Sequence, residues 1–195
     1  RTGDPSSSLS ALLAESKKRP RAISVAIPST SSRVVLAEIN RLGGTQLVPV
    51  GYNGSANAVT DLLGGHVDAT IDTLGALKTY IQAGKITPLA VSLSERSAAM
   101  PNLPTIVEAG LNGFSVSPWN VIAAPAGTPA PIVELLSRRL REVFAEPEVR
   151  ESLQNRNGLV FGKEEAMSVD EIRRFIADEL AKWGQLIRTS GIQPQ

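Results

Sequence analysis

Hydrophobic and polar positions follow two different periods that alternate along the first half of the chain. Short apolar runs typical of β-strands are each followed by a stretch in which apolar residues recur every three or four positions, as in an amphipathic helix. The predicted strands cover residues 23–27, 46–50, 67–71 and 86–93. The predicted helices cover residues 8–16, 33–42, 55–63 and 74–82. Strands alternating with helices indicate βαβ units, a largely parallel sheet and the α/β class.

The second half of the chain has a different pattern, first extended and then helical. Residues 114–124 look extended, and the prolines of residues 125–129 are typical of a linker. Thr105 and Glu108 have the spacing of a capping box at the start of a short helix over residues 105–109. Three helices are predicted after the linker. The first has the apolar stripe Ile132, Leu136, Leu140 and Val143, and the second is opened by Pro147. The third begins with the capping-box pair Ser168 and Glu171.

Composition excludes several classes of protein. The chain has 195 residues with 42% hydrophobic content, which is enough for a sizeable core. The 20 basic and 19 acidic residues are nearly balanced, whereas a nucleic-acid-binding surface needs a basic excess, so no nucleic-acid partner is expected. There is no cysteine, which excludes disulfides and thiolate metal sites. The start, Arg1 to Pro5, predicts either a cytosolic protein or one whose targeting segment was removed.

Polar groups suited to anion binding gather in three strand-to-helix connections. The first is Pro28-Ser29-Thr30-Ser31-Ser32, the second is Tyr52-Asn53-Gly54-Ser55, and the third is Asp72-Thr73. The first loop alone is explained equally well by helix capping, and each of the three alone is weak evidence for a ligand site. All three follow parallel strands, however, so we expect them to open on one edge of the sheet, where helix N-termini attract a carboxylate or phosphate. The candidate ligand-binding residues are Ser29, Thr30, Ser31, Ser32, Tyr52, Asn53, Gly54, Ser55, Asp72, Thr73 and Trp119.

Trp119 has two interpretations, because an aromatic residue in this extended segment suits either the wall of a cleft or an anchor between two core layers. Trp183 lies on the apolar stripe of the last helix and is expected in the core.

No catalytic constellation or metal site is predicted. The single histidine, His66, follows a glycine pair and is expected to be a solvated turn residue. Asp68 and Asp72 stand at opposite ends of one predicted strand, roughly 13 Å apart at the usual rise, too far for a glycosidase pair. The sequence has no Gly-x-Ser-x-Gly motif. We therefore expect a binding protein with no catalytic residues, no cofactor and no metal.

Several segments, in order along nearly the whole chain, resemble one family of receptors. These segments are Tyr52-Asn53-Gly54-Ser55 with its continuation to Asp68, Ala83-Gly84-Lys85-Ile86, Leu103-Pro104-Thr105-Ile106, Ala124-Pro125-Ala126-Gly127-Thr128-Pro129, Pro147-Glu148-Val149-Arg150, Lys182-Trp183 and Ser190-Gly191-Ile192. Together they resemble the solute-binding proteins of tripartite tricarboxylate transporters, the TctC-like or Bug family.

The resemblance implies a type II periplasmic-binding-protein fold with two lobes. Such proteins trap small carboxylates in a cleft, hold them through backbone amides, hydroxyls and water, and present them to membrane transporter subunits in the periplasm. The resemblance implies no cofactor. Three departures bear on the ligand: the first loop lacks the usual glycines, Asn53 stands where a lysine is usual, and Thr73 stands where an asparagine is usual.

The resemblance covers only about the last two-thirds of a family member. Residues 1–122 are expected to form the second lobe, with its parallel sheet, and residues 123–195 the C-terminal helices of an incomplete first lobe. These helices have apolar stripes, including Phe175 and Trp183, but no sheet of their own to cover. We expect the stripes to pack on the second lobe, on a partner chain as in a homodimer, or on a first-lobe segment outside this sequence.

Two other functions fit the same fold. One is the effector-sensing domain of a transcription regulator, which would need a DNA-binding segment upstream of the sequence. The other is a truncated module without transport function, retained for interaction with a receptor or sensor. The loss of loop glycines and of the lysine slightly favours this truncated module.

Overall fold

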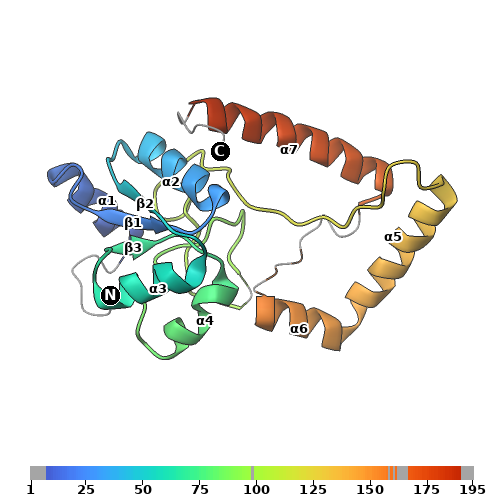
Figure 1. Ribbon diagram of the computed structural model, residues 1–195, viewed down its shortest axis with the longest axis horizontal. Helices are drawn as coiled ribbons and strands as arrows, with labels where there is room; N and C mark the ends of the chain where they lie inside the picture. Colours follow the sequence, from blue (N-terminus) through green and yellow to red (C-terminus); the bar gives the residue numbers. More distant parts are fainter. Residues whose placement is uncertain (1–7, 98, 158, 160, 162–166, 190–195) are drawn as a thin grey trace. The chain divides into compact units, whose positions relative to one another are not determined.

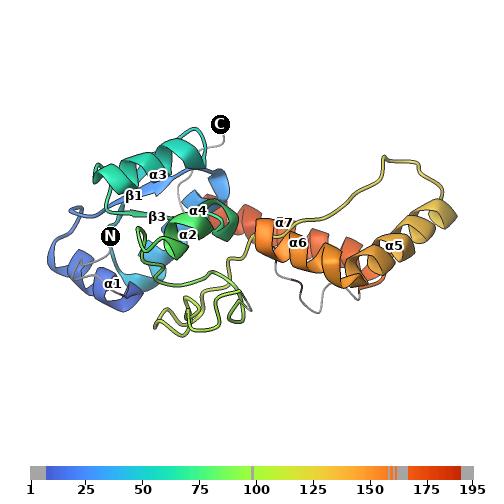
Figure 2. The same ribbon diagram turned by 90° about the horizontal axis from the view of Figure 1, so that it is seen from below.

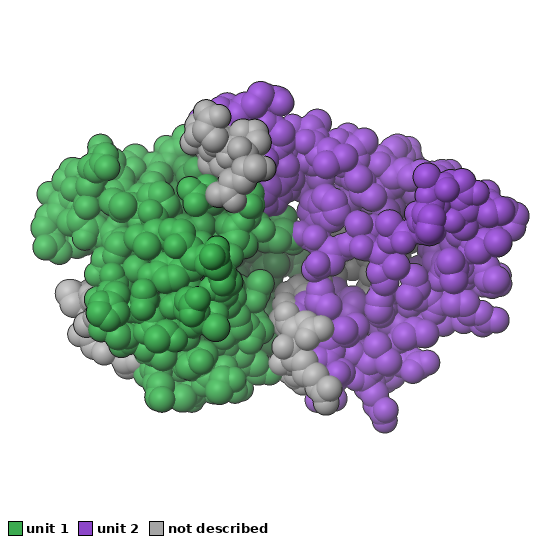
Figure 3. All heavy atoms as spheres, viewed as in Figure 1, with its two compact units in different colours: residues 1–118 green, residues 119–195 purple. Residues whose placement is uncertain are grey.

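The chain forms two compact units, residues 1–118 and residues 119–195 (Figure 3). The computed structural model describes residues 8–97, 99–157, 159, 161 and 167–189. Arg1 to Pro5 and the Ser190-Gly191-Ile192 segment lie outside the described residues. The division expected after residue 122 lies in the same extended segment as the division between the units.

Unit 1 is built on a parallel sheet of three strands in the order β2-β1-β3. Strand β1 (Ser24–Ile27) pairs with β2 (Val48–Gly51) along its whole length and with β3 (Ala69–Thr70) over two residues. Backbone bonds from Asp68 to Ser24 and from Ile71 to Ala26 extend the β3 pairing on both sides. The predicted parallel α/β organisation is confirmed, and three of the four predicted strands are present.

Helices cover both faces of this sheet (Figures 1 and 2). They are α1 (Leu9–Lys18), α2 (Thr30–Gly43), α3 (Ser55–Gly64) and α4 (Leu74–Gln82). Helices α1 and α2 lie on one face and α3 on the other, as both views show. On the α3 face, Ala26, Ala58, Val59 and Leu62 form a buried cluster, against which α4 contributes Leu77 and Ile81. Alternation along β1 sends Val25 and Ile27 to the opposite face, where both are buried.

The prediction of a fourth strand over residues 86–93 is wrong. A single parallel bridge joins Val91 to Thr105, and no longer ladder forms in this segment. The bridge consists of two bonds, from the Val91 N–H to Pro104 and from the Ile106 N–H to Val91, and Pro88 has no backbone N–H with which to extend it. The predicted short helix over residues 105–109 is a turn, although its capping box forms: the Glu108 carboxylate accepts from the Thr105 N–H at 2.8 Å.

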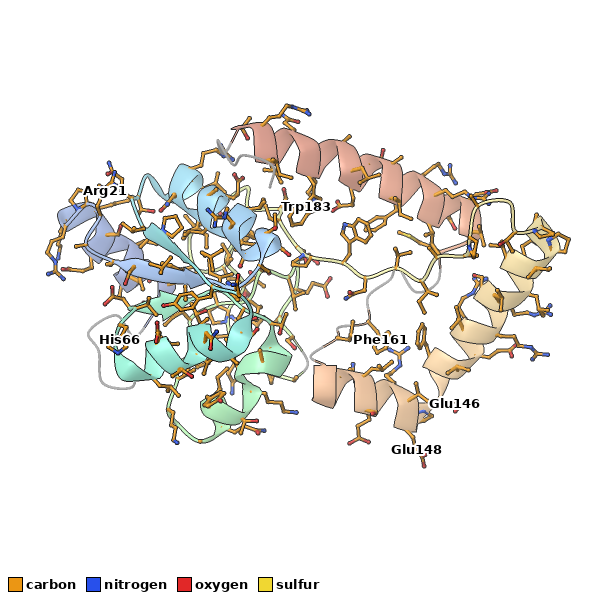
Figure 4. All side chains as sticks on the ribbon, in the orientation of Figure 1. Arg21, His66, Glu146, Glu148, Phe161 and Trp183 are labelled. Carbon is orange, nitrogen blue, oxygen red and sulfur yellow. The ribbon has the colours of Figure 1, made fainter. Side chains whose placement is uncertain are left out.

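Unit 2 contains three helices and the extended segment that precedes them. The helices are α5 (Ala130–Ala145), α6 (Pro147–Asn157) and α7 (Val169–Thr189). Ser168 and Glu171 form the predicted capping box at the start of α7. Neither α5 nor α7 has a residue that is buried in the described part of the structure. Trp183, expected in the core, is therefore only partly buried (Figure 4).

None of the helices among the described residues combines the length and the hydropathy needed to cross a lipid bilayer.

Candidate functional site

Three helix N-termini stand at one edge of the unit 1 sheet. Each strand leads directly into a helix, β1 into α2, β2 into α3 and β3 into α4. Because the strands are parallel and adjacent, their carboxyl ends lie at the same edge, with neighbouring strands about 4.8 Å apart. This topology brings together the three loops selected from the sequence. Each helix end also carries a partial positive charge and backbone N–H groups without intrahelical partners.

At the start of α2, two of the four hydroxyls are engaged within the protein. The Ser32 N–H donates to Ser29 Oγ at 3.2 Å, and the Ser29 N–H donates to Ser32 Oγ at 3.1 Å. This reciprocal arrangement is a capping box, so the structural interpretation holds for Ser29 and Ser32. Thr30 is exposed and Ser31 is half-buried, and neither side chain has a hydrogen bond within the described part of the chain. The hydroxyls of Thr30 and Ser31 are the ones available to a ligand.

The start of α3 has no side-chain cap. Gly54 is its N-cap residue, with φ 95°, a backbone conformation that favours glycine. Ser55 is the first residue of the helix, as predicted, and Asn53 is exposed nearby. The first N–H groups of α3 therefore lack the side-chain oxygen that usually satisfies them, which makes this the most open of the three helix ends.

The Tyr52 hydroxyl is directed to α3, the helix that follows the second loop. It donates to Asp61 Oδ2 at 2.7 Å, and the ring packs against the cluster between α3 and the sheet. The hydrogen bond to Asp61, with help from burial, raises the pKa of the Tyr52 phenol above its ordinary value. Tyr52 thus positions the second loop through a partner nine residues away, a pairing that no periodicity in the sequence signals.

At the start of α4, Asp72 and Thr73 have different roles. The Thr73 hydroxyl caps the helix by accepting from the Ala76 N–H at 3.4 Å. One Asp72 oxygen accepts from the Thr73 N–H at 2.7 Å. The other, Oδ2, is buried and has no partner among the residues that the structure describes. A buried carboxylate oxygen requires a donor, so Asp72 is suited to a hydroxyl or amino group.

Trp119 lies in unit 2, against α7. Its indole N–H donates to Glu179 Oε2 at 3.1 Å, and its ring meets Phe175 edge-on with centroids 5.7 Å apart. The same carboxylate oxygen accepts from the Trp183 indole at 3.0 Å, while Lys182 bonds its other oxygen at 2.8 Å. These contacts support the interpretation of Trp119 as a structural anchor, and its role at the ligand stays a prediction.

Arg33 was missed by the sequence analysis. Its Nη2 atom lies 3.5 Å from the point that a Cβ atom on Gly51, the last residue of β2, would occupy. The side chain is half-buried and forms no ion pair within the described part of the chain. A signal was present in the sequence, because a cation in the first turns of a helix is electrostatically unfavourable unless an anion lies nearby.

Other polar residues of unit 1 have structural roles. His66 is exposed in the turn after α3, as expected (Figure 4). The Asp68 carboxylate accepts from both the N–H and the hydroxyl of Ser24, at 2.8 and 2.7 Å, and so ties β3 to β1. Among the residues that the structure describes, no group of histidine or acidic side chains is arranged to hold a metal ion.

Unit 2 contains a groove of about 520 Å³ between α5 and the start of α7. Its lining mixes Arg138, Arg141 and Arg173 with the acidic Glu134 and Asp170. Arg173 and Asp170 neutralise one another at 2.8 Å. The groove thus has no single sign of charge, and its chemistry is less specific than that of the sheet edge.

Comparison with known proteins identifies the relatives of this chain. The model of the tripartite tricarboxylate transporter family receptor matches residues 1–192. The protein BugT of Bordetella pertussis is 36% identical over 190 residues, covering 94% of this chain and 56% of BugT. Among solved structures, R. palustris Rpa4515 with adipate is 29% identical with a TM-score of 0.81, covering 99% of this chain and 64% of that one.

A second solved structure, that of the periplasmic binding protein BugD, is 26% identical with a TM-score of 0.76. The match covers 100% of this chain and 65% of BugD. The chain therefore spans a little over half of BugT and less than two-thirds of both structures. The resemblance and the periplasmic-binding-protein fold predicted from the sequence are both confirmed. The matching family is one of receptors and not of enzymes, as expected.

Proposed function

The chain belongs to the tripartite tricarboxylate transporter receptor family, and on that premise we propose that it captures a small organic anion of the carboxylate class. The observation that carries this proposal is the convergence of three helix N-termini at one edge of the sheet, with the α3 end uncapped. Backbone N–H groups at helix ends bind carboxylates without any charged side chain, and the helix dipoles reinforce them.

The residues proposed to contact the ligand are those with free groups at this edge. At the start of α2 these are the backbone N–H groups and hydroxyls of Thr30 and Ser31. At the start of α3 they are those of Ser55, beside exposed Asn53. Asp72 contributes the acceptor already described. Ser29, Ser32, Tyr52, Gly54 and Thr73 shape the three loops. The second-lobe assignment of residues 1–122, and that of residues 123–195 to the first lobe, belong to the same proposal.

Transport and location follow from the family and are likewise proposed. The family is named for receptors of tripartite tricarboxylate transporters, and the solved relative BugD is a periplasmic binding protein. We therefore infer that the chain acts in the periplasm and delivers its ligand to membrane transporter subunits. A homodimer through unit 2 is a further proposal, supported by the exposed apolar residues of α5 and α7.

The direct test is isothermal titration calorimetry with adipate, the molecule bound in the relative Rpa4515, and with mono- and tricarboxylates. Hexane-1,6-diol, which has the carbon chain of adipate without its charges, is the matched control. We expect saturable binding of at least one carboxylate and none of the diol. A chain that binds the diol as well as adipate would contradict anion capture.

A fully flat titration would instead favour the interaction module considered from the sequence. The engaged hydroxyls of Ser29, Ser32 and Tyr52 are the feature that this alternative explains. Under that alternative, substituting Ser31 or Tyr52 would change no detectable ligand binding.

A further inference from the structure

We propose that Arg33 is a ligand-binding residue that holds one carboxylate of the captured anion beside the ends of β1 and β2. The inference rests on the proposed function and names a residue that the loops alone do not include. It starts from one observation: a half-buried guanidinium lies at the anion-binding edge without an acidic partner in the described part of the chain.

The position of Arg33 follows from helix geometry. Side chains on a helix lean toward its N-terminus, so Arg33, in the first turns of α2, extends toward the carboxyl edge of the sheet. There its Nη2 atom lies against Gly51, which has no side chain to displace it. Gly51 pairs with Ile27, the residue after which the chain enters the loop to α2. The guanidinium is thus beside the start of α2, where Thr30 and Ser31 lie.

Arg33 also balances the charge at this edge of the sheet. The segments 28–33, 51–55 and 71–74 contain two charged residues, the acidic Asp72 and the basic Arg33. Without Arg33, an incoming carboxylate would meet the Asp72 charge uncompensated. Arg33 also stands near the positive end of a helix, where a cation is unfavourable until an anion joins it.

Another arginine of the same helix shows how a structural guanidinium is satisfied. Arg41 makes two hydrogen bonds to Glu38, both at 2.7 Å, and this pairing raises the pKa of Arg41. Arg33 has no such partner within the described residues. The planar guanidinium of Arg33 matches the two oxygens of a carboxylate, which takes a pair of parallel N–H···O bonds.

The first test compares Arg33→Gln and Arg33→Lys with Lys85→Gln by titration calorimetry with adipate. Lys85 is exposed beyond the C-terminal end of α4, so Lys85→Gln removes the same charge far from the carboxyl edge. We expect Arg33→Gln to weaken binding roughly tenfold or more, as loss of a hydrogen bond to a charged group does. The Kd of Arg33→Lys should lie between those of the wild type and Arg33→Gln, and Lys85→Gln should change the Kd less than twofold.

The second test moves the guanidinium without removing its charge. An alanine methyl at Gly51 would meet Nη2 at an ordinary contact distance, whereas the larger valine side chain would displace it. We expect Gly51→Ala to bind adipate nearly as the wild type does and Gly51→Val to bind several-fold more weakly. The pair keeps the inference testable if Arg33→Gln folds poorly, which circular dichroism would show.

The outcomes separate this inference from the proposed function. Wild-type binding of adipate with unchanged affinity in Arg33→Gln and Gly51→Val would overturn the role of Arg33 and leave anion capture standing. A wild-type chain that binds no carboxylate would overturn both. A loss of affinity in Lys85→Gln as large as in Arg33→Gln would show that only the overall charge matters, and would also overturn the assignment.

Discussion

At the scale of single residues, the hydroxyl groups of the first loop divide into structural and available ones. Ser29 and Ser32 satisfy each other and the start of α2, and Ser32 is 4% exposed. Ser31, between them, has no such partner in the described structure. We therefore propose that neighbouring serines at the start of α2 have separable roles, Ser29 in stability and Ser31 in binding.

This division predicts opposite results for two alanine substitutions. Ser29→Ala removes the N-cap oxygen of α2 and should lower the free energy of unfolding by about 1 kcal/mol. Ser31→Ala should leave the free energy of unfolding unchanged and weaken adipate binding. Urea unfolding and calorimetry on both variants check this. Equal stability of the two variants would mean that the capping box contributes nothing.

Tyr52 gives a prediction for alkaline pH. Its raised pKa means that the bond to Asp61 contributes stability fully below the ordinary tyrosine pKa, and that the contribution is lost as pH rises through the raised value. Asp61→Asn should lower the pKa of Tyr52 toward about 10. The chain has two tyrosines, so ultraviolet titration in a Tyr80→Phe background reports Tyr52 alone. An unchanged pKa in Asp61→Asn would refute the assigned cause.

How far the sequence predicts the site differs from residue to residue. The three loops could be found because strand-to-helix connections follow from periodicity alone. The partner of Tyr52 could not, because contact with Asp61 depends on how the ring packs under α3. Arg33 was overlooked because its approach to Gly51 is a tertiary contact. It joins the first turns of α2 to the end of β2, which comes later in the chain.

At the scale of elements, the open end of α3 is the most informative. Its first N–H groups have no side-chain cap, so a ligand carboxylate can accept from them. Proline is tolerated at the first position of a helix because its missing N–H has no intrahelical partner. This allows a single backbone donor to be removed from the site while the helix is retained.

Ser55→Pro and Ser55→Ala form a matched pair for this element. Ser55→Pro removes both the hydroxyl and the backbone N–H, whereas Ser55→Ala removes the hydroxyl alone. We expect Ser55→Pro to weaken adipate binding roughly tenfold relative to Ser55→Ala, since a hydrogen bond to a charged group contributes about 1.5–3 kcal/mol. Calorimetry checks the affinity and circular dichroism the helix. Equal affinities would exclude this N–H from binding.

Helices were easier to predict than strands, for physical reasons. The predicted and observed bounds of α3 and α4 agree within one residue, because their apolar periods and their flanking glycine or threonine mark both ends. A strand exists only with a partner. Residues 86–93 have a strand-like composition, but with Pro88 inside the segment only the bridge at Val91 forms.

At the scale of the whole molecule, the two units differ in how they bury apolar side chains. Unit 1 has its core between the sheet and the helices, and Leu36 is among its fully buried side chains. In unit 2, helices α5 and α7 leave Leu136 48% and Leu180 64% exposed. Periodicity predicted the apolar stripes of these helices, and the family resemblance predicted that they have no sheet of their own to cover.

This difference predicts how the chain responds to polar substitutions. Leu136→Gln and Leu180→Gln, together, should reduce binding of the dye anilinonaphthalene sulfonate while each changes the free energy of unfolding by less than about 0.5 kcal/mol, as surface substitutions do. Leu36→Ala should lower the free energy of unfolding by roughly 2–5 kcal/mol, because it opens a cavity in a packed core.

If the exposed leucines instead hold copies of the chain together, light scattering will show a dimer that the two glutamine substitutions dissociate. A monomer that binds no dye would contradict an uncovered apolar face on unit 2, since an exposed patch of this kind must meet water, a partner or the dye.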